Sequence, residues 1–543
     1  MPNLARLMME GTSGKFQSVL PPITPPAWTS FTTGKNPGKH GVFHFMEAKP
    51  DSYALSYTNA SSRRTRTVWK ILNEAGLTTG TTNIPFTYPP EPLNGYQISG
   101  MDTPSEKSAF IHPPQLREEL EKTLGALKLD IRFLGFMNTD HRRHQVLDDM
   151  RAMDEQWTRV GLYLLQHRTQ DVMMSVFMSI DTVQHYFWQF MDETHFLHDP
   201  NADARFRIAI REVYERLDAS LGKFLEHAGD ETSVFVVSDH GGGPVSDRVV
   251  YLNRYLSQMG LLHYATDTTN PLRTAVRAVI RGLYSLLRDN LNSRQKVWLA
   301  DRLPQLRQKF ENSYTSYTSI DWQRTQAYCS EVLASPPSIW INLKGLKPQG
   351  IVEPADYEKV RDEIVTKLGG LKDPRTGEPV IKRVLKREKI FDGRFAADAP
   401  DLILDWWEGS HFSTSPSFPD ERNKPAVEII EKRPTKGSEW GGTHRLHGIL
   451  VAKGPHFRRG AEIAGARLID FAPTLLYLLE QPVPREMDGK VLSDLFEPEY
   501  LRSHPIRYDD GNEDFPVSET PAGYSDEEAA QVEERLKALG YME

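Results

Sequence analysis

Aspartate and histidine residues follow two apolar stretches of this sequence, at the points where buried strands should end. Asp181 closes the run "DVMMSVFMSID", and His185 comes four residues later, a spacing that puts both side chains on one face of a helix. Asp239 and His240 follow "TSVFVVS" and precede three glycines. Carboxylates and imidazoles bind divalent metals, and open α/β sheets collect ligands outside the carboxyl ends of their strands. These residues therefore predict a metal site at one edge of a sheet.

A third corner, "GGTHRLHGILVAKGP", places His444 and His447 just before another apolar strand. Each of these three Asp and His motifs, taken singly, is common in proteins and has a simple structural interpretation. An aspartate with a histidine four residues on is usually a helix cap with a surface histidine, and an Asp-His pair before glycines is usually a turn. Several such corners in one chain, together with a nearby hydroxyl, are what a two-metal site for phosphoryl chemistry needs.

The hydroxyl is that of Thr24, in the stretch "PPITPPAWTSFTTGKNPGKHG". Thr24 stands where a helix N-cap belongs, and Pro25 and Pro26 suit the first turn of that helix. A hydroxyl at a helix N-terminus faces a position that attracts anions, and metal binding would lower its pKa and make it a nucleophile. Capping alone is the simpler interpretation, and the two roles are compatible.

A phosphate-binding P-loop in "GKNPGKHG" is a competing interpretation that fails on spacing. That motif needs four residues between its glycines and a Ser or Thr after the lysine. Here Gly34 and Gly38 are separated by three residues, and His40 follows Lys39. Nearby His40 and His44 are expected to shape the loop after Thr24.

Strands and helices alternate along the first 250 residues, which predicts a doubly wound, mostly parallel sheet with helices on both faces. This regular alternation of apolar strands and helices ends near Tyr251. The segment "NPLRTAVRAVIRGLYSLLRDNL" is a basic amphipathic helix with Arg273, Arg277 and Arg281 in one stripe. Such a stripe could lie on a membrane, but we expect it to be the solvated face of a packed helix.

Composition limits the remaining possibilities. The chain of 543 residues has a formal net charge of −8, which predicts no general binding of nucleic acid. A single cysteine, Cys329, excludes a disulfide framework and a cysteine-rich zinc site. We find no apolar run long enough to span a membrane and no signal peptide, so we expect a soluble, cytoplasmic protein of unknown oligomeric state.

Taken in order, these segments resemble the alkaline phosphatase superfamily. The nearest branch is the type I phosphodiesterase and nucleotide pyrophosphatase group, with its prokaryotic members predicted to be phosphohydrolases or phosphomutases. The resemblance covers most of the chain and includes "PFTYPPEPLNGYQISGMDTPS" and "DFAPTLLYLLEQPVPREMDGKVLSDLF" besides the stretches quoted above. It implies an alkaline phosphatase-like core at 1–250 and 396–500, an inserted α+β cap at 251–395, and a tail with a charged helix at 501–543.

The resemblance assigns a role to each candidate residue. Thr24 resembles the nucleophile, which becomes transiently phosphorylated or nucleotidylated. Two divalent ions, expected to be zinc with manganese as the alternative, are implied, and Asp181, His185 and His444 resemble the ligands of one of them. Asp239 and His240 resemble ligands of the second ion, which also contacts Thr24. His447, His195 and His198 are expected to be outside the site, the last two on the surface.

Two departures from the family pattern matter. The family begins with an apolar strand ending in an aspartate ligand of the second metal, whereas the start of this sequence resembles the segment after that strand. We therefore expect an unfilled place in the sheet and an incomplete second site. Phe45 stands near an asparagine that binds phosphoryl oxygens in nucleotide pyrophosphatases, and it cannot donate a hydrogen bond.

The sequence thus predicts metal-dependent hydrolysis of a small-molecule phosphodiester or phosphomonoester through Thr24. Two alternatives stay open: a phosphomutase on the same core, in which the inserted segment acts as a lid, and a catalytically impaired binding protein that lacks one metal ligand. The substrate-facing residues and the substrate itself are not identified by any motif.

Overall fold

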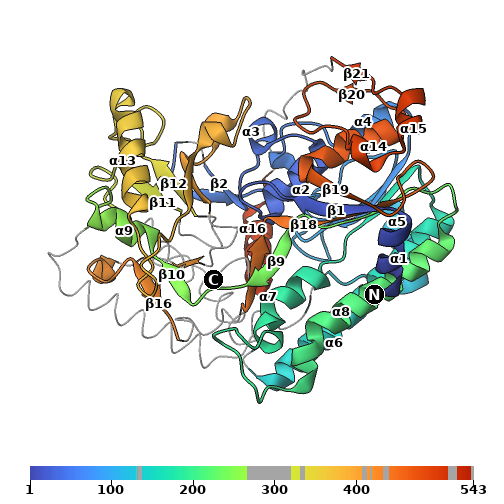
Figure 1. The fold of residues 1–543 in the computed structure, drawn as a ribbon, viewed down its shortest axis with the longest axis horizontal. Helices are drawn as coiled ribbons and strands as arrows, with labels where there is room; N and C mark the ends of the chain where they lie inside the picture. Colours follow the sequence, from blue (N-terminus) through green and yellow to red (C-terminus); the bar gives the residue numbers. More distant parts are fainter. Residues whose placement is uncertain are drawn as a thin grey trace.

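The structure is a computed structural model. It describes residues 1–49, 51–129, 131, 137, 139–265, 319–330, 337–405, 412–415, 417, 419–431, 440–510 and 523–539. The fold is of the mixed α/β class, with several sheets and helices packed on them (Figure 1). The expected basic helix with Arg273, Arg277 and Arg281 lies outside the described residues.

One four-stranded sheet carries the strands that lead into the candidate site. Its order is β19 (Ala461–Arg467), β1 (Thr12–Gln17), β18 (His447–Lys453) and β8 (Val234–Val237). Strand β1 runs parallel to β19 and antiparallel to β18, which is in turn antiparallel to β8. Because these pairings are mixed, the single, mostly parallel sheet expected from the sequence stays a prediction.

A second four-stranded sheet has the order β6 (Ile111–His112), β5 (Gly95–Ser99), β4 (Thr79–Ile84) and β7 (Val172–Ser175). Strands β5, β4 and β7 are parallel. All six residues of β4 are buried, although four of them are threonine or asparagine, because β4 lies between β5 and β7. Strand β7 is only partly buried, and Ser175 at its end is exposed.

Helices cover both faces of these sheets (Figure 1). One face is covered by α2 (Thr24–Thr33), α4 (Val68–Glu74), α14 (Phe471–Leu478) and α15 (Pro498–Ser503). The other is covered by α1 (Pro2–Glu10), α6 (Asp140–His167), α7 (Ser179–Met191) and α8 (Ala204–His227). Helix α5 (Pro114–Leu124) follows β6. The helical and strand patterns predicted in these regions are confirmed.

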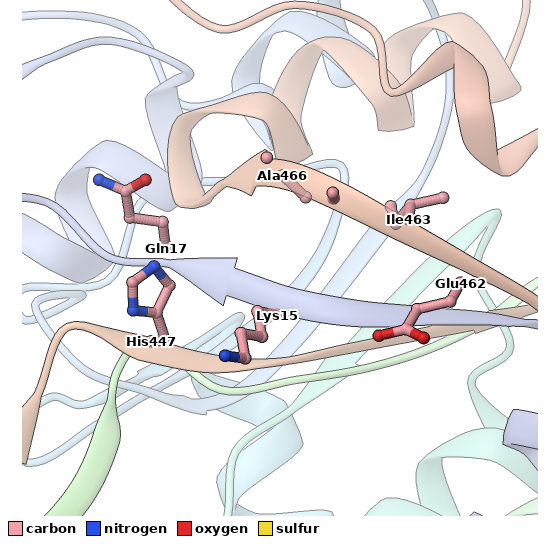
Figure 2. A pocket seen from close by; sticks show the side chains of 8 residues that line it. Lys15, Gln17, His447, Glu462, Ile463 and Ala466 are labelled. Atoms are coloured by element: carbon pink, nitrogen blue, oxygen red, sulfur yellow. The ribbon is translucent and has the colours of Figure 1, made fainter.

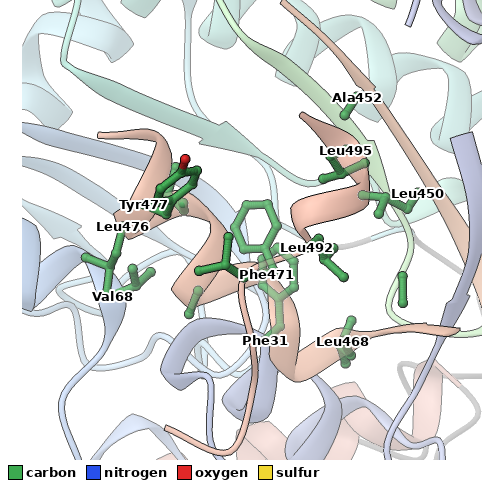
Figure 3. Packing of buried hydrophobic residues seen from close by; sticks show 14 of the residues in the cluster. Phe31, Val68, Leu450, Ala452, Leu468, Phe471, Leu476, Tyr477, Leu492 and Leu495 are labelled. Carbon is green, nitrogen blue, oxygen red and sulfur yellow. The ribbon is translucent and has the colours of Figure 1, made fainter. Parts of the chain in front are cut away.

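The main core lies between the first sheet and helices α2 and α14 (Figure 3). Phe31 of α2 stacks on Phe471 of α14 with ring centroids 4.1 Å apart, and both pack near Leu450 of β18. All ten residues of α2 are buried. The helix that begins at Thr24 is therefore held on every side, which fixes the position of that residue.

A second core occupies a separate region, on the left of Figure 1. It contains a sheet of order β11 (Ala327–Cys329), β12 (Ser338–Ile341), β14 (Leu402–Asp405) and β13 (Arg383–Lys386), all antiparallel. Helices α9 (Leu252–Gln258) and α13 (Tyr357–Gly369) pack with it. Its residues run from Val250 to Val427, so β14 packs with the insertion although it follows the predicted boundary at 395.

The remaining elements are short or peripheral. Helix α16 (Asp526–Ala538) packs Val532 and Leu536 against Phe45, Phe86 and Met101. Ser525 caps this helix, since its hydroxyl accepts a hydrogen bond from the N–H of Glu528. The others are α3 (Pro37–His40), β2 (Met46–Ala48), β3 (Leu55–Tyr57), β9 (Gly241–Pro244), β10 (Arg248–Val250), β15 (Ser413–Thr414), β16 (Val427–Ile429), β17 (Gly442–Arg445), β20 (Val483–Pro484) and β21 (Tyr508–Asp509).

Within the described part of the chain, no helix is both long and apolar enough to cross a bilayer. The cytoplasmic localisation expected from the sequence stays a prediction.

Candidate metal centre

Helix α7 positions the first two candidate ligands. Asp181 lies in its first turn and His185 one turn later, and the His185 Nε2 atom is 3.3 Å from the Asp181 Oδ1 atom. The i, i+4 spacing seen in the sequence thus brings the two groups together as predicted. His185 is buried, and Asp181 is largely covered.

His444 reaches the same place from strand β17. Its Nε2 atom lies 3.1 Å from the Nε2 atom of His185 and 3.6 Å from the Asp181 carboxylate. The three ligand atoms lie within 4.8 Å of one another, which makes Asp181, His185 and His444 a candidate metal-binding group. Strand β17 pairs with β9, so the glycines 241–243, which the sequence predicted to form a turn, are in fact extended.

Asp239 and His240 adjoin this group. The His240 Nε2 atom is 3.5 Å from Asp239 Oδ2 and 3.9 Å from Asp181 Oδ1. The His240 ring also stacks on the His444 ring, with centroids 3.6 Å apart. The three corners predicted from the sequence therefore meet at one place, with Asp181 in the middle.

Backbone carbonyl groups determine which nitrogen of each imidazole carries the proton. The Nδ1 atom of His185 is 2.9 Å from the Gly442 oxygen, and that of His444 is 2.8 Å from the Pro22 oxygen. The Nδ1 atom of His240 is 3.0 Å from the Gly241 oxygen. Because a carbonyl oxygen can only accept, each Nδ1 donates and each neutral ring leaves a lone pair on Nε2.

The facing lone pairs fit a metal ion. Two Nε2 atoms that both carry lone pairs repel each other at 3.1 Å unless a metal ion or a proton lies between them, and the adjoining carboxylate favours such a positive charge. Four-coordinate zinc with Zn–N distances of about 2.0–2.1 Å would separate its ligand atoms by about 3.3–3.4 Å. The observed ligand separations of 3.1, 3.3 and 3.6 Å bracket that value.

The pKa values of the two carboxyl groups are shifted in opposite directions. Burial favours the neutral form of Asp181, but His185, His444 and His240, when they carry a proton on Nε2, hold its pKa well below the usual range. For Asp239, burial raises the pKa, with a smaller contribution from the charge of Asp181, and His240 only partly opposes this. Burial and the two neighbouring imidazoles hold the pKa of His444 well below its usual value, which keeps that ring neutral.

Thr24 is the first residue of α2 and is buried. The sequence predicted it to be the N-cap, and this is wrong: the cap is Ile23, whose side chain makes no capping bond. The hydroxyls of Thr29 and Thr33 bond to carbonyl groups four residues earlier in the helix. The Thr24 hydroxyl cannot make this bond, because no helical turn precedes Thr24. The carbonyl oxygen of nearby Pro22 already accepts a hydrogen bond from His444.

The loop after α2 does not offer its lysines to a phosphate. Lys35 pairs with Glu486 at 2.9 Å, and Lys39 pairs with Asp488 at 2.7 Å. His40 is buried and bonds to the Ser30 hydroxyl at 2.9 Å, so it shapes this loop as expected. The spacing argument against a P-loop is thereby supported.

Two of the histidines that were predicted to lie outside the site, His447 and His195, occupy different surroundings. His447 begins β18 and lies with Lys15, Gln17 and Glu462 around a hollow on the first sheet (Figure 2), and it is not in the metal-binding group. His195 was expected at the surface, which is wrong: it is buried and bonds to the Gly441 oxygen at 3.0 Å.

Some residues of the centre carried no signal in the sequence. Trp440 stacks on His185 with ring centroids 3.7 Å apart. Pro22 and Gly442 contribute only backbone oxygens, which any residue could supply. The two adjacent glycines before His444, Gly441 and Gly442, were the one sequence feature that indicated a close backbone contact at this place.

Comparison with known proteins decides the family. The sequence model described as "Type I phosphodiesterase / nucleotide pyrophosphatase" matches residues 1–427. The chain belongs to this family. The protein is therefore a phosphoric ester hydrolase of the phosphodiesterase and nucleotide pyrophosphatase type, with a candidate metal site. The resemblance inferred from the sequence is confirmed.

Solved structures similar to this phosphodiesterase family member include human ectonucleotide pyrophosphatase / phosphodiesterase 5, at 13% identity and a TM-score of 0.47. That match covers 91% of this chain and 94% of the human one. Phosphonoacetate hydrolase from Sinorhizobium meliloti 1021 matches at 14% identity and a TM-score of 0.47, over 87% of this chain and 88% of that chain. No curated protein sequence matches.

Proposed function

We propose that this protein hydrolyses a phosphodiester or phosphomonoester of a small molecule with two divalent metal ions and Thr24 as nucleophile. The observation that carries the proposal is the pair of Nε2 lone pairs of His185 and His444, which face each other at 3.1 Å beside Asp181. Such an arrangement is stable around a cation and has no evident structural purpose without one.

Asp181, His185 and His444 would hold the first ion, and Asp239 and His240 would contribute to the second. Zinc suits the imidazole-rich group, and manganese is the alternative. When bound, the ions would supply positive charge for the attacking oxygen, the leaving oxygen and the equatorial oxygens of the phosphoryl group. A cation bound at Asp239 would offset the burial that raises the pKa of this carboxyl group.

Thr24 would attack the phosphorus atom, forming a bond from its Oγ1 atom while the bond to the leaving group breaks. Water would then hydrolyse the phosphothreonine and restore the hydroxyl. Of the first three residues of α2, only Thr24 has a backbone N–H to donate, because Pro25 and Pro26 lack one. The phosphoryl oxygens would therefore depend on that single N–H and on the bound ions more than on the helix terminus.

We further propose that one more strand fits between β7 and β8, completing a single doubly wound sheet. Each is an apolar strand at the end of its sheet, and among the described residues β7 pairs with β4 alone and β8 with β18 alone. Both pack on the same core cluster, yet both are only partly buried. The segments that follow them meet at Asp181 and His240, so a strand between them would end at the centre.

The domain division is also proposed in a revised form. The catalytic core would comprise residues 1–249 and 430–500, since the second core includes residues as far as Val427. The inserted unit would then span Val250–Ile429 and the tail 501–543. The phosphomutase alternative, with this unit as a lid, stays a prediction and requires isomerisation of a sugar phosphate without release of free phosphate.

Thr24→Ala tests the nucleophile. Release of p-nitrophenol from p-nitrophenyl phosphate and from a bis-p-nitrophenyl diester would be measured beside the bound metal content. We expect kcat to fall by roughly 1,000-fold or more, as removal of a nucleophile does, with the ion at Asp181, His185 and His444 still bound. Thr29→Ala, on the same helix but back-bonded to Pro25, is the matched control. An undiminished rate in Thr24→Ala would refute the mechanism.

The metal count tests the two-metal mechanism. Metal content would be determined by plasma mass spectrometry for the 543-residue chain. Two ions per chain would support the mechanism, one ion would show that the second site is incomplete, and no metal would refute the mechanism.

A further inference from the structure

His195 lies in a turn directly after α7, outside the ligand group. Asp192 builds that turn: its carboxylate accepts hydrogen bonds from the N–H and hydroxyl of Thr194 and from the indole of Trp188. The N–H of His195 in turn donates to the Asp192 carbonyl at 3.1 Å. The imidazole is thus presented by a segment that the helix itself anchors.

The tautomer of His195 is fixed by its neighbours. The N–H of Leu197 donates to its Nδ1 atom at 3.0 Å, so that nitrogen is an acceptor. The proton of the neutral ring is therefore on Nε2, which donates to the Gly441 oxygen at 3.0 Å. His195 differs in this respect from the three ligand imidazoles, whose protons are on Nδ1.

Gly441 and Gly442 connect the hydrogen bond made by His195 Nε2 to the candidate ligands His185 and His444. The N–H of Gly441 donates to the His185 carbonyl at 2.7 Å, and the Gly442 oxygen accepts from His185 Nδ1. The backbone is pressed against α7: a Cβ atom on Gly442 would lie 2.3 Å from the Gln184 oxygen. Strand β17 leads directly from this pair to His444.

We infer that His195 is a positioning residue for the metal centre, acting through Gly441 on both His185 and His444. This inference rests on the proposed metal-dependent function. The hydrogen bond from His195 to the Gly441 oxygen, here called the clamp, affects two ligands. Gly442, the next residue, orients the His185 ring and is two residues from His444 on the same strand. Loss of the His195 donor would loosen β17 against α7 and spread the two Nε2 atoms, which weakens metal binding. Outer partners of this kind commonly change metal affinity by roughly 10- to 100-fold.

Two substitutions separate the two bonds of His195. In His195→Asn the side-chain oxygen can still accept from Leu197, as Nδ1 does, but the chain is too short to reach Gly441. In His195→Gln the amide nitrogen can take the place of Nε2 and donate to the Gly441 oxygen. The asparagine variant thus keeps the turn and loses the clamp, while the glutamine variant keeps the clamp. His198→Asn is the matched control, since His198 bonds to the Gln189 oxygen of α7 and not to β17.

The experiment measures the dissociation constant of Zn²⁺ for the full metal-free chain by competition with a chromophoric chelator, beside kcat, KM and the melting temperature of the metal-free protein. We expect His195→Asn to weaken Zn²⁺ binding by roughly 10- to 100-fold, with a lower kcat and little change in KM. His195→Gln should restore the affinity to within a few-fold, and His198→Asn should match the wild type.

Two results would overturn the inference. Wild-type Zn²⁺ affinity in His195→Asn, even with a lower melting temperature, would reduce His195 to a structural residue and leave the proposed function intact. Equal losses in the asparagine and glutamine variants would show that the donor to Gly441 is not what matters. A wild-type chain that binds no metal would refute this inference together with the proposed function, which distinguishes that failure from the other two.

Discussion

The two halves of the metal centre are held in different ways. The half formed by Asp181, His185 and His444 is fixed by long-range bonds, since its imidazoles donate to carbonyl groups 257 and 422 residues away in the chain. In the other half, His240 donates to the oxygen of the next residue, and burial leaves Asp239 with a raised pKa. The first half is preorganised by tertiary packing, whereas the second is built locally.

This difference predicts a strong and a weak metal site. Preorganisation removes much of the entropic cost of binding, so the first half should bind its ion more tightly. The second half should depend on the first, because Asp181 lies within 3.9 Å of His240 and contributes negative charge to both.

The largest expected effect comes from the residue that the two halves share. Asp181→Asn removes the charge that faces His185, His444 and His240, and it leaves three imidazoles with no carboxylate between them. We expect loss of both metal ions and a fall in kcat/KM of roughly 1,000-fold or more. Metal content and the rate of ester hydrolysis check this, and a variant that keeps either ion would show that the halves are independent.

The next prediction contrasts one imidazole from each half. His444→Ala should abolish binding of the tight ion and also release Pro22, two residues from Thr24. His240→Ala should leave the tight ion bound and remove the weaker one, because it deletes one of the ligands of the second half. Titration calorimetry with Zn²⁺ distinguishes the variants. Identical metal stoichiometry in the His444→Ala and His240→Ala variants would contradict the proposed difference between the two halves.

Removal of metal from the unaltered protein should proceed in two phases. A chelator of graded concentration should take the weakly held ion first, and activity should fall with this first equivalent, since both ions are needed. We expect the two dissociation constants to differ by roughly 10-fold or more, because only one half is preorganised. Release of both ions together would indicate a single cooperative site.

The smallest effect on the centre is expected at a third buried carboxyl group, that of Asp102. It accepts hydrogen bonds from the N–H groups of Phe86, Thr87 and Tyr88, yet burial raises its pKa from 3.8 to about 6. Folding therefore favours its protonated form. The stability from this group is present at low pH and is lost as the pH rises through 6.

Asp102→Asn should remove that pH dependence without altering the metal centre. Between pH 4.5 and 7, the free energy of unfolding of the wild type should fall by roughly 2 kcal/mol relative to the variant. Urea denaturation at the two pH values measures the difference, and Zn²⁺ affinity serves as the control. Parallel pH curves for the two proteins would contradict the shift.

The sequence was sufficient to predict which Asp and His side chains come together at the candidate site, but not the groups that hold them. Asp181 and His185 were found because helical spacing is local, and Asp239 was found because apolar strands end in recognisable ways. The carbonyl groups of Pro22 and Gly442 could not be found, since a backbone oxygen has no residue type. His195 was misassigned for a related reason: its burial depends on a strand that lies 246 residues away.

The fold was predictable to a similar extent. The apolar strands that were predicted before Asp239 and after His444 are present as β8 and β18, because their apolar residues mark them as buried. The extended glycines of β9 were missed, since glycine has no side chain to show alternation. The sequence carries no signal for the extent of the second core, because β14 has the same apolar character as a strand of the main sheet, and only its pairing with β12 and β13 distinguishes it.

The contact of Gly442 with α7 has a consequence for the tolerance of this chain to mutation. Even alanine would bring its methyl group within 2.3 Å of a backbone oxygen, and no side-chain rotation can relieve that overlap. In a library of random variants, position 442 should therefore accept almost nothing but glycine, although glycine has no side chain with which to bind a metal or a substrate. A screen for retained activity would identify it as sharply as it identifies the ligands themselves.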